Sequence, residues 1–148
     1  MVLLAFVGLM WVVMGVGSTA KYFQSEDHIG KTLAHMVEAG KTATIEQCVD
    51  EVLAWRPQCT ALVGLCDGSI DRVMSACLAG QDRTNECLAL REDIGHTGLG
   101  VEECRARGIE RRKGQDKECA KSYGQVSAYC RELLPDEFAH VVLPGDKR

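Results

Sequence analysis

The hydrophobic and polar positions of this chain form one uncharged N-terminal block followed by a series of helical stripes. Residues 2–20 carry no charged side chain. As a helix they would be about 28 Å long, which is close to the hydrocarbon thickness of a bilayer. Lys21, Tyr22 and Phe23 follow directly, and a cation beside two aromatic rings suits the membrane interface. The pattern therefore predicts a transmembrane anchor over residues 1–23.

A cleaved secretory signal is the rival interpretation of this block, because Ser18 and Ala20 are small residues at cleavage positions. The anchor is favoured because no basic residue precedes the block and because the block is long for a signal. Gly8 and Gly15 lie seven residues apart on one helical face, which would let a second membrane helix approach closely. The alternative is a lone span in which these glycines have no packing role.

Residues 24–43 are expected to form an amphipathic connector helix, with Ser25 as its N-cap and Gly40 at its end. His28 and His35 share one face of this helix. A metal site there would need further ligands nearby, so we expect solvated or partly buried histidines. The apolar stripe of the helix consists of Ile29, Leu33, Met36 and Val37.

The most informative pattern lies in residues 44–80, where four cysteines follow the palindromic spacing C-x10-C-x6-C-x10-C. Opposite positions of an antiparallel helix pair have a constant sum of residue numbers. Cys48 with Cys77 and Cys59 with Cys66 share the same sum. Eleven residues at about 100° each return to within roughly 20° of the starting direction, so both cysteines of one helix can face the other. The spacing predicts a first helical hairpin with a disulfide at each end.

Local signals agree with this hairpin. Thr44 and Gln47 form a capping box for its first helix, and Pro57 predicts a kink or restart before Cys59. Ser69 is expected to cap the return helix, and Gly80 to end it. The return helix has an apolar stripe of Ile70, Val73, Met74, Cys77 and Leu78.

Residues 81–134 contain the other four cysteines. Pairing Cys87 with Cys130 and Cys104 with Cys119 would make a second disulfide hairpin, although the two sums of residue numbers differ and four cysteines allow three connectivities. A helical pattern runs from 101 to 134, weakened at two glycines. Residues 135–148 are a tail that starts at a proline. The apolar stripe of this helical pattern consists of Cys119, Tyr123, Val126, Cys130 and Leu133. The two weakening glycines are Gly108 and Gly114. The tail carries the apolar residues Phe138, Val141, Val142 and Leu143, which suggest a docking segment.

Eight cysteines and an aromatic share of only 5% in 148 residues predict a thin core reinforced by disulfides, in an oxidising compartment. Zinc is not expected, because its cysteine ligands normally come in C-x(2–4)-C pairs and no two cysteines here are that close. The same spacing excludes a C-x-x-C redox centre. No catalytic motif or cofactor loop is present, so neither an enzyme nor a cofactor is expected. A net charge of −4 with interspersed signs argues against nucleic acid.

A basic run follows a glycine-rich linker that spans residues 95–100. It consists of Arg105, Arg107, Arg111, Arg112, Lys113, Lys117 and Lys121. Acidic residues interrupt it at helical spacings, so an exposed helix with many ion pairs is the expected structure. The alternative is a docking face, over Arg105–Lys121, for anionic lipid or for an acidic protein surface.

The cysteine pattern of residues 48–77 resembles the coiled-coil-helix–coiled-coil-helix proteins of the mitochondrial intermembrane space, which carry twin C-x9-C pairs on an antiparallel hairpin. The spacing here is C-x10-C, one residue longer, and the resemblance extends loosely to residue 130. It implies import into the intermembrane space and oxidation there. It also implies a structural or assembly role in an inner-membrane respiratory complex.

The sequence as a whole predicts an all-α, single-span protein whose disulfide domain lies in the mitochondrial intermembrane space. The expected role is a non-catalytic accessory or assembly subunit of a membrane complex, with other subunits and the bilayer as partners. The main alternative is a secreted or periplasmic disulfide-rich binding protein or inhibitor, released by cleavage at Ala20. A lipid or hydrophobic-ligand binder with a cavity between the hairpins is a further alternative.

Overall fold

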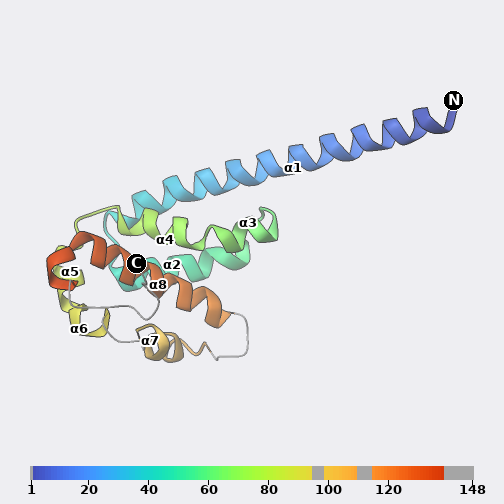
Figure 1. Ribbon diagram of the computed structural model, residues 1–148. Coiled ribbons are helices and arrows are strands. Elements are labelled where there is room, and N and C mark those ends of the chain that lie inside the picture. Colours follow the sequence, from blue (N-terminus) through green and yellow to red (C-terminus); the bar gives the residue numbers. More distant parts are fainter. Residues whose placement is uncertain (1, 95–98, 110–114, 139–148) are drawn as a thin grey trace.

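The computed structural model describes the backbone of residues 2–94, 99–109 and 115–138, with side chains from residue 19 onward except Gln115. The described residues are helices joined by short turns (Figure 1). The structure is all-helical and contains four disulfides, which confirms the predicted class.

The helical elements have the following bounds. They are α1 (Val2–Gly40), α2 (Ile45–Trp55), the 3-10 turn η1 (Arg56–Gln58), α3 (Val63–Gly68), α4 (Ile70–Leu78), α5 (Thr84–Ala89), α6 (Arg91–Ile94), α7 (Val101–Ala106), α8 (Gln115–Leu133) and α9 (Pro135–Phe138).

Helix α1 is one continuous rod, although the sequence suggested that a new helix begins at Ser25. Ser25 is not a cap: its hydroxyl donates to the carbonyl of Lys21 at 2.8 Å, as a serine in mid-helix does. Residues 18–29 contain neither proline nor glycine, and extending a formed helix costs less than starting a new one. The expected anchor and connector therefore belong to a single element.

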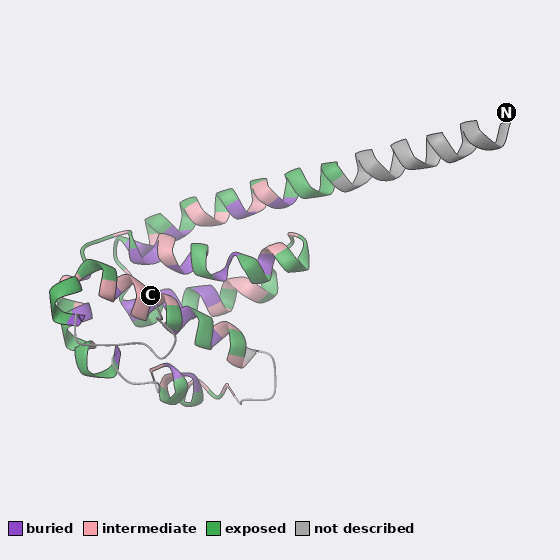
Figure 2. Cartoon of the chain, in the orientation of Figure 1, coloured by how far each residue is buried: buried purple, intermediate pink, exposed green. Residues whose placement is uncertain are grey.

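Helix α4 lies at the centre of the fold, with α1, α2 and α8 packed around it (Figures 1 and 2). The five apolar residues predicted for its stripe are all buried. Ile29 and Met36 of α1, Val52 of α2 and Val126 of α8 are also buried. The two predicted hairpins therefore share one core. Two residues of the predicted stripes lie outside this core, since Val37 is 40% and Leu133 is 37% exposed.

The first hairpin follows the predicted local signals except at Ser69. Thr44 and Gln47 form the capping box of α2, and Pro57 lies in η1. Ser69 occupies the N-cap position of α4, but its side chain makes no capping hydrogen bond. A capping residue normally has an extended backbone, whereas the backbone of Ser69 is in the right-handed helical region (φ −99°, ψ −2°). Helix α4 therefore follows α3 almost without a break.

The helical run expected over residues 101–134 is divided in two. Helix α7 ends at Ala106, and Gly108 then adopts a left-handed backbone with φ of +71°. Helix α8 begins at Gln115; Gly114 lies outside the described residues. A left-handed glycine just beyond a helix end is the usual helix stop, so Gly108 is a terminator rather than a weak point.

The tail is described only as far as Phe138. Pro135 is the first residue of α9, where a proline needs no backbone hydrogen bond. Phe138 is buried at 5% exposure and joins the core, as expected of a docking segment. Val141, Val142 and Leu143 lie outside the described residues.

Candidate functional site

Two disulfides hold the first hairpin at its base and at its tip. Cys48 of α2 is joined to Cys77 of α4, with 5.8 Å between their Cα atoms. Cys59, just after η1, is joined to Cys66 of α3, with a Cα separation of 6.1 Å. These are the pairs that the palindromic spacing predicts.

The second set joins α8 to two different helices. Cys130 pairs with Cys87 of α5 and Cys119 with Cys104 of α7, at Cα separations of 5.3 and 6.1 Å. The connectivity is the one favoured from the sequence. The partner of α8 is, however, a pair of short helices rather than one antiparallel helix, which is why the two sums of residue numbers differ. All eight cysteines are therefore paired.

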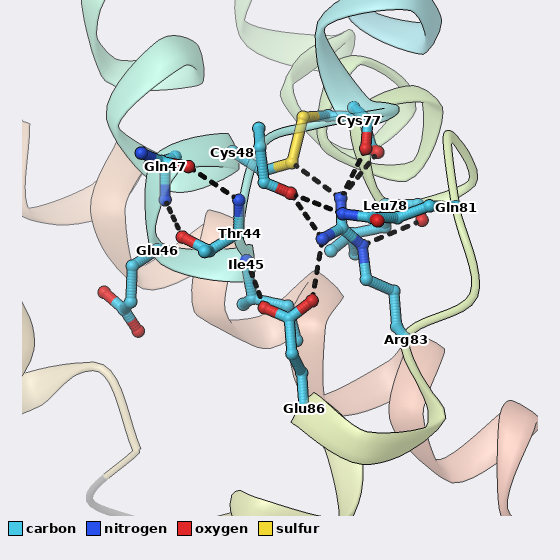
Figure 3. The surroundings of a disulfide bond; sticks show 12 residues. Thr44, Ile45, Glu46, Gln47, Cys48, Cys77, Leu78, Gln81, Arg83 and Glu86 are labelled. Carbon is cyan, nitrogen blue, oxygen red and sulfur yellow. Dashed lines mark hydrogen bonds and ion pairs between the residues drawn. A yellow bond between two sulfur atoms is a disulfide. The ribbon is translucent and has the colours of Figure 1, made fainter.

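The base of the first hairpin is held by a guanidinium that has no exposed surface. Arg83 is fully buried beside the Cys48–Cys77 disulfide (Figure 3). Its acceptors are the carbonyl oxygens of Gly40 (2.9 Å), Ala43, Cys77 (3.4 Å) and Leu78 (3.3 Å), and Oε1 of Glu86 (2.7 Å). We call Arg83, Glu86 and these carbonyls the Arg83 junction.

The chemistry of the Arg83 junction follows from where α1 and α4 end. The last carbonyls of a helix lack partners within the helix and carry partial negative charge. Gly40 ends α1, while Cys77 and Leu78 end α4, so one guanidinium satisfies both helix ends. The other carboxylate oxygen of Glu86 accepts from the backbone N–H of Ile45, 2.7 Å away, in the first turn of α2. Three helix ends therefore meet at one ion pair.

Two glycines let these helix ends approach. A Cβ on Gly40 would overlap the carbonyl oxygen of Cys77, and a Cβ on Gly80 would overlap the backbone of Gly40. Both glycines were expected only to stop helices. Here they also permit the backbones of α1 and α4 to touch, which brings the carbonyls within reach of Arg83.

A second cluster joins α2 to α7 and α8. The hydroxyl of the buried Tyr123 donates to a carboxylate oxygen of Glu46 at 2.5 Å and accepts from Arg107 at 2.8 Å. Arg107 also pairs with Glu46 and Asp50, each at 2.6 Å. Burial and the hydrogen bond to Glu46 raise the pKa of Tyr123 well above its ordinary value. Burial alone would lower the pKa of Arg107, but its bonds to Asp50 and Glu46 outweigh that effect and raise it.

A third cluster lies near the hairpin tip. Arg56 pairs with Asp67 across the hairpin and approaches Glu118 of α8 at 3.6 Å. Lys121 of α8 donates to the carbonyl of Asp67 at 3.1 Å. These contacts attach the first hairpin to α8 at its far end.

Of the four described residues in the predicted basic run, three form ion pairs or hydrogen bonds within the protein. Arg105 pairs with Glu102, Arg107 belongs to the second cluster and Lys121 to the third. Arg111, Arg112 and Lys113 lie outside the described residues. Arg105 forms a local ion pair of the kind that the helical spacing predicts, whereas Arg107, just beyond the end of α7, and Lys121 of α8 make tertiary contacts.

The histidines of α1 border a shallow groove of about 350 Å³ between α1 and α2. His28 Nδ1 lies 3.4 Å from the hydroxyl of Thr60, and His35 lines the groove with Trp55. Among the described residues, no three His, Cys, Asp or Glu side chains are placed to hold a metal ion. A larger groove of about 840 Å³ lies between α7 and α8, bordered by Leu99, Ile109 and other residues.

Four large apolar side chains are exposed on the hairpin tip and on the turn of α1 just before Ser25. They are Tyr22 (47% exposed), Phe23 (70%), Leu62 (44%) and Val63 (70%), and we call them the tip patch. The tip is tied to α1 by the backbone N–H of Leu62, which donates to the hydroxyl of Ser25 at 3.0 Å. A bare cluster of this kind marks a contact surface more often than an isolated exposed residue does.

Among the described residues, no helix has the length and apolar character needed to cross a membrane. The side chains of residues 2–18 lie outside the described part, so the packing predicted for Gly8 and Gly15 does too.

Comparison with known proteins identifies no relative. No family model, curated protein or solved structure matches this chain.

Sequence reasoning missed the residues that organise these clusters. Arg83, Glu86 and Glu46 carry no motif, and an arginine after a helix stop looks like any solvated residue. Tyr123 was expected in the apolar stripe, but its hydrogen bonds to Glu46 and Arg107 were not. The sequence offers one weak sign of the Arg83–Glu86 ion pair. Arg83 lies between two predicted helices and three residues before Glu86, a spacing at which an arginine and a glutamate can pair.

Proposed function

We propose that this chain is a non-catalytic accessory or assembly subunit of a membrane protein complex, anchored in the bilayer by residues 2–20. Its disulfide domain then lies in an oxidising compartment, which we assign as the mitochondrial intermembrane space that the resemblance implies. The tightly joined helix ends give the domain a fixed shape, and a fixed surface loses less conformational entropy when a partner binds.

One observation carries the proposal. Residues 19–24 of α1 are all exposed, and six successive residues cover every face of a helix. Helix α1 thus leaves the domain before Ser25, and the uncharged residues 2–20 continue the same helix beyond it (Figure 1). An uncharged rod of this length that leaves its own domain needs another apolar environment, and a bilayer provides one.

Membrane extraction and N-terminal sequencing of the native chain test the anchor. We expect the chain to stay with membranes in alkaline carbonate, to dissolve in detergent and to begin at Met1 or Val2. A mature chain that begins at Lys21 would instead support the secreted or periplasmic binding protein and would reject the anchor.

Co-purification in mild detergent tests the subunit role. The double variant Gly8→Ile with Gly15→Ile should stay in the membrane but lose partner subunits, because larger side chains block close helix approach. Gly17→Ile is the matched control, since residue 17 lies about 200° around the helix from residue 15. A chain that purifies alone, in native and variant form, would remove the subunit role.

A further inference from the structure

We propose that the tip of the first hairpin is a second membrane contact, with Leu62 and Val63 inserted among the lipid headgroups beside α1. This inference rests on the proposed membrane anchor and names the lipid interface as the ligand of the tip patch.

The height of the tip along α1 is the first argument. The bond between Leu62 and Ser25, with the contact between Thr60 and His28, fixes the tip at the level of residues 25–28. Ser25 lies five residues beyond Ala20, or about 7.5 Å along the helix axis. The headgroup layer on each side of a bilayer is about 5–8 Å thick. If residues 2–20 fill the hydrocarbon, the tip lies at headgroup depth.

The chemistry of the tip is the second argument. The tip runs from Thr60 to Cys66 without a charged side chain, and its most exposed large apolar residue is Val63 at 70%. The first charge beyond it, Asp67, is paired with Arg56. An uncharged apolar tip suits the boundary between headgroups and acyl chains, where a charge would oppose insertion.

The surroundings of the tip identify lipid as the occupant. Tyr22 and Phe23 are exposed and lie less than one helical turn before Ser25, the residue of α1 to which the tip is bonded. Lys21 precedes them. Tyrosine and a neighbouring cation are typical of the membrane interface. Tyr22 is three residues before Ser25 and so lies on the side of α1 that faces the tip. Two separate segments thus present apolar side chains at one height.

The consequence is a fixed orientation of the domain. A single span lets a domain rotate and tilt on the bilayer, whereas a span with a second contact beside it does not. Because the Cys59–Cys66 disulfide and the Arg56–Asp67 pair hold the tip, the contact also fixes the first hairpin and the faces of α2 and α8 behind it.

Quenching by lipids with brominated acyl chains tests the inference on the full chain in phosphatidylcholine vesicles. Trp11 and Trp55 are replaced by Phe, and Val63→Trp is introduced as the reporter. The Trp55→Phe change is mild, since Nε1 of Trp55 has no hydrogen-bond partner among the described residues. Leu88→Trp is the matched control, because Leu88 is 41% exposed on α5, at the opposite end of the domain (Figure 1).

We expect brominated lipid to quench the Val63→Trp reporter and shift its emission to shorter wavelength, and to leave the Leu88→Trp control unchanged. The Trp55→Phe chain, which retains Trp11, reports on the anchor. Quenching of Trp11 without quenching at position 63 would overturn the tip contact and leave the anchor intact. Quenching at neither position would overturn both. A shift to shorter wavelength at position 63 without quenching would mean that protein covers the tip, and would also overturn the inference.

Discussion

At the scale of residues, two buried polar side chains connect several helices around the apolar core. Arg83 satisfies carbonyls at the ends of α1 and α4, and Tyr123 links a carboxylate of α2 to Arg107. Such groups are costly to bury unless every partner is present. Each should therefore be more sensitive to substitution than an apolar residue of similar burial.

We expect Arg83→Met to lower the free energy of unfolding by about 3–5 kcal/mol, because it leaves Glu86 and four carbonyls without their donor. Urea unfolding of the oxidised chain in detergent, followed by circular dichroism, measures the loss. Arg72→Met is the control, since Arg72 is exposed on α4 and should change little. Equal effects of the two substitutions would contradict the role given to the Arg83 junction.

The Tyr123 cluster predicts a loss of stability at high pH. The pKa of Tyr123 is raised above the ordinary 10.0 in the folded state, so its contribution is complete below that value and falls as the pH rises beyond it. We expect the free energy of unfolding to drop as the pH rises above about 10, and the drop to be smaller in Tyr123→Phe. Identical pH profiles for the two chains would show that Tyr123 does not contribute to the drop.

At the scale of elements, the close crossing of α1 and α4 decides how the predicted helices assemble. Gly40 and Gly80 are in backbone contact, and the Cys48–Cys77 disulfide lies beside them. Helix α4 then contacts α1, α2 and α8 at once, so a shift at this crossing would reach most of the core.

Gly80→Ala should destabilise the fold, because its Cβ has no room against the backbone of Gly40. Overpacking of this kind typically costs about 1–3 kcal/mol. Gly124→Ala in α8 is the matched control: nothing lies within 4 Å of its Cβ position, and alanine should stabilise the helix by up to about 1 kcal/mol. Thermal unfolding of both variants measures the difference. A neutral Gly80→Ala would mean that the crossing is looser than described.

At the scale of the whole molecule, one core serves both sets of disulfides, and α1 is part of it. Residues 19–24 are exposed, but Ser25, Ile29 and Met36 are buried against the hairpin. The second half of α1 is thus a structural member of the domain, while the first half continues the same helix beyond it (Figure 1).

A chain that starts at Lys21 should therefore fold, form all four disulfides and show helical circular dichroism, which should fall on reduction. A chain that starts at Lys41 should form mixed disulfides, because it exposes the apolar face of α4 and removes the Gly40 carbonyl from Arg83. Disulfide mapping by mass spectrometry distinguishes the two. Correct pairing in the shorter chain would show that α1 is dispensable.

The sequence by itself determined the helical class, the stripe of α4 and the Cys48–Cys77 and Cys59–Cys66 pairs, because helical periodicity and constant-sum spacing can be read directly from residue positions. Only the tertiary structure decided that Ser25 lies in mid-helix, that α8 pairs with two short helices, and that Arg83 is buried. These features depend on which helix ends meet in space. Contacts such as those of Arg83 with Gly40 and Ala43 join residues about forty positions apart, and no local pattern encodes them.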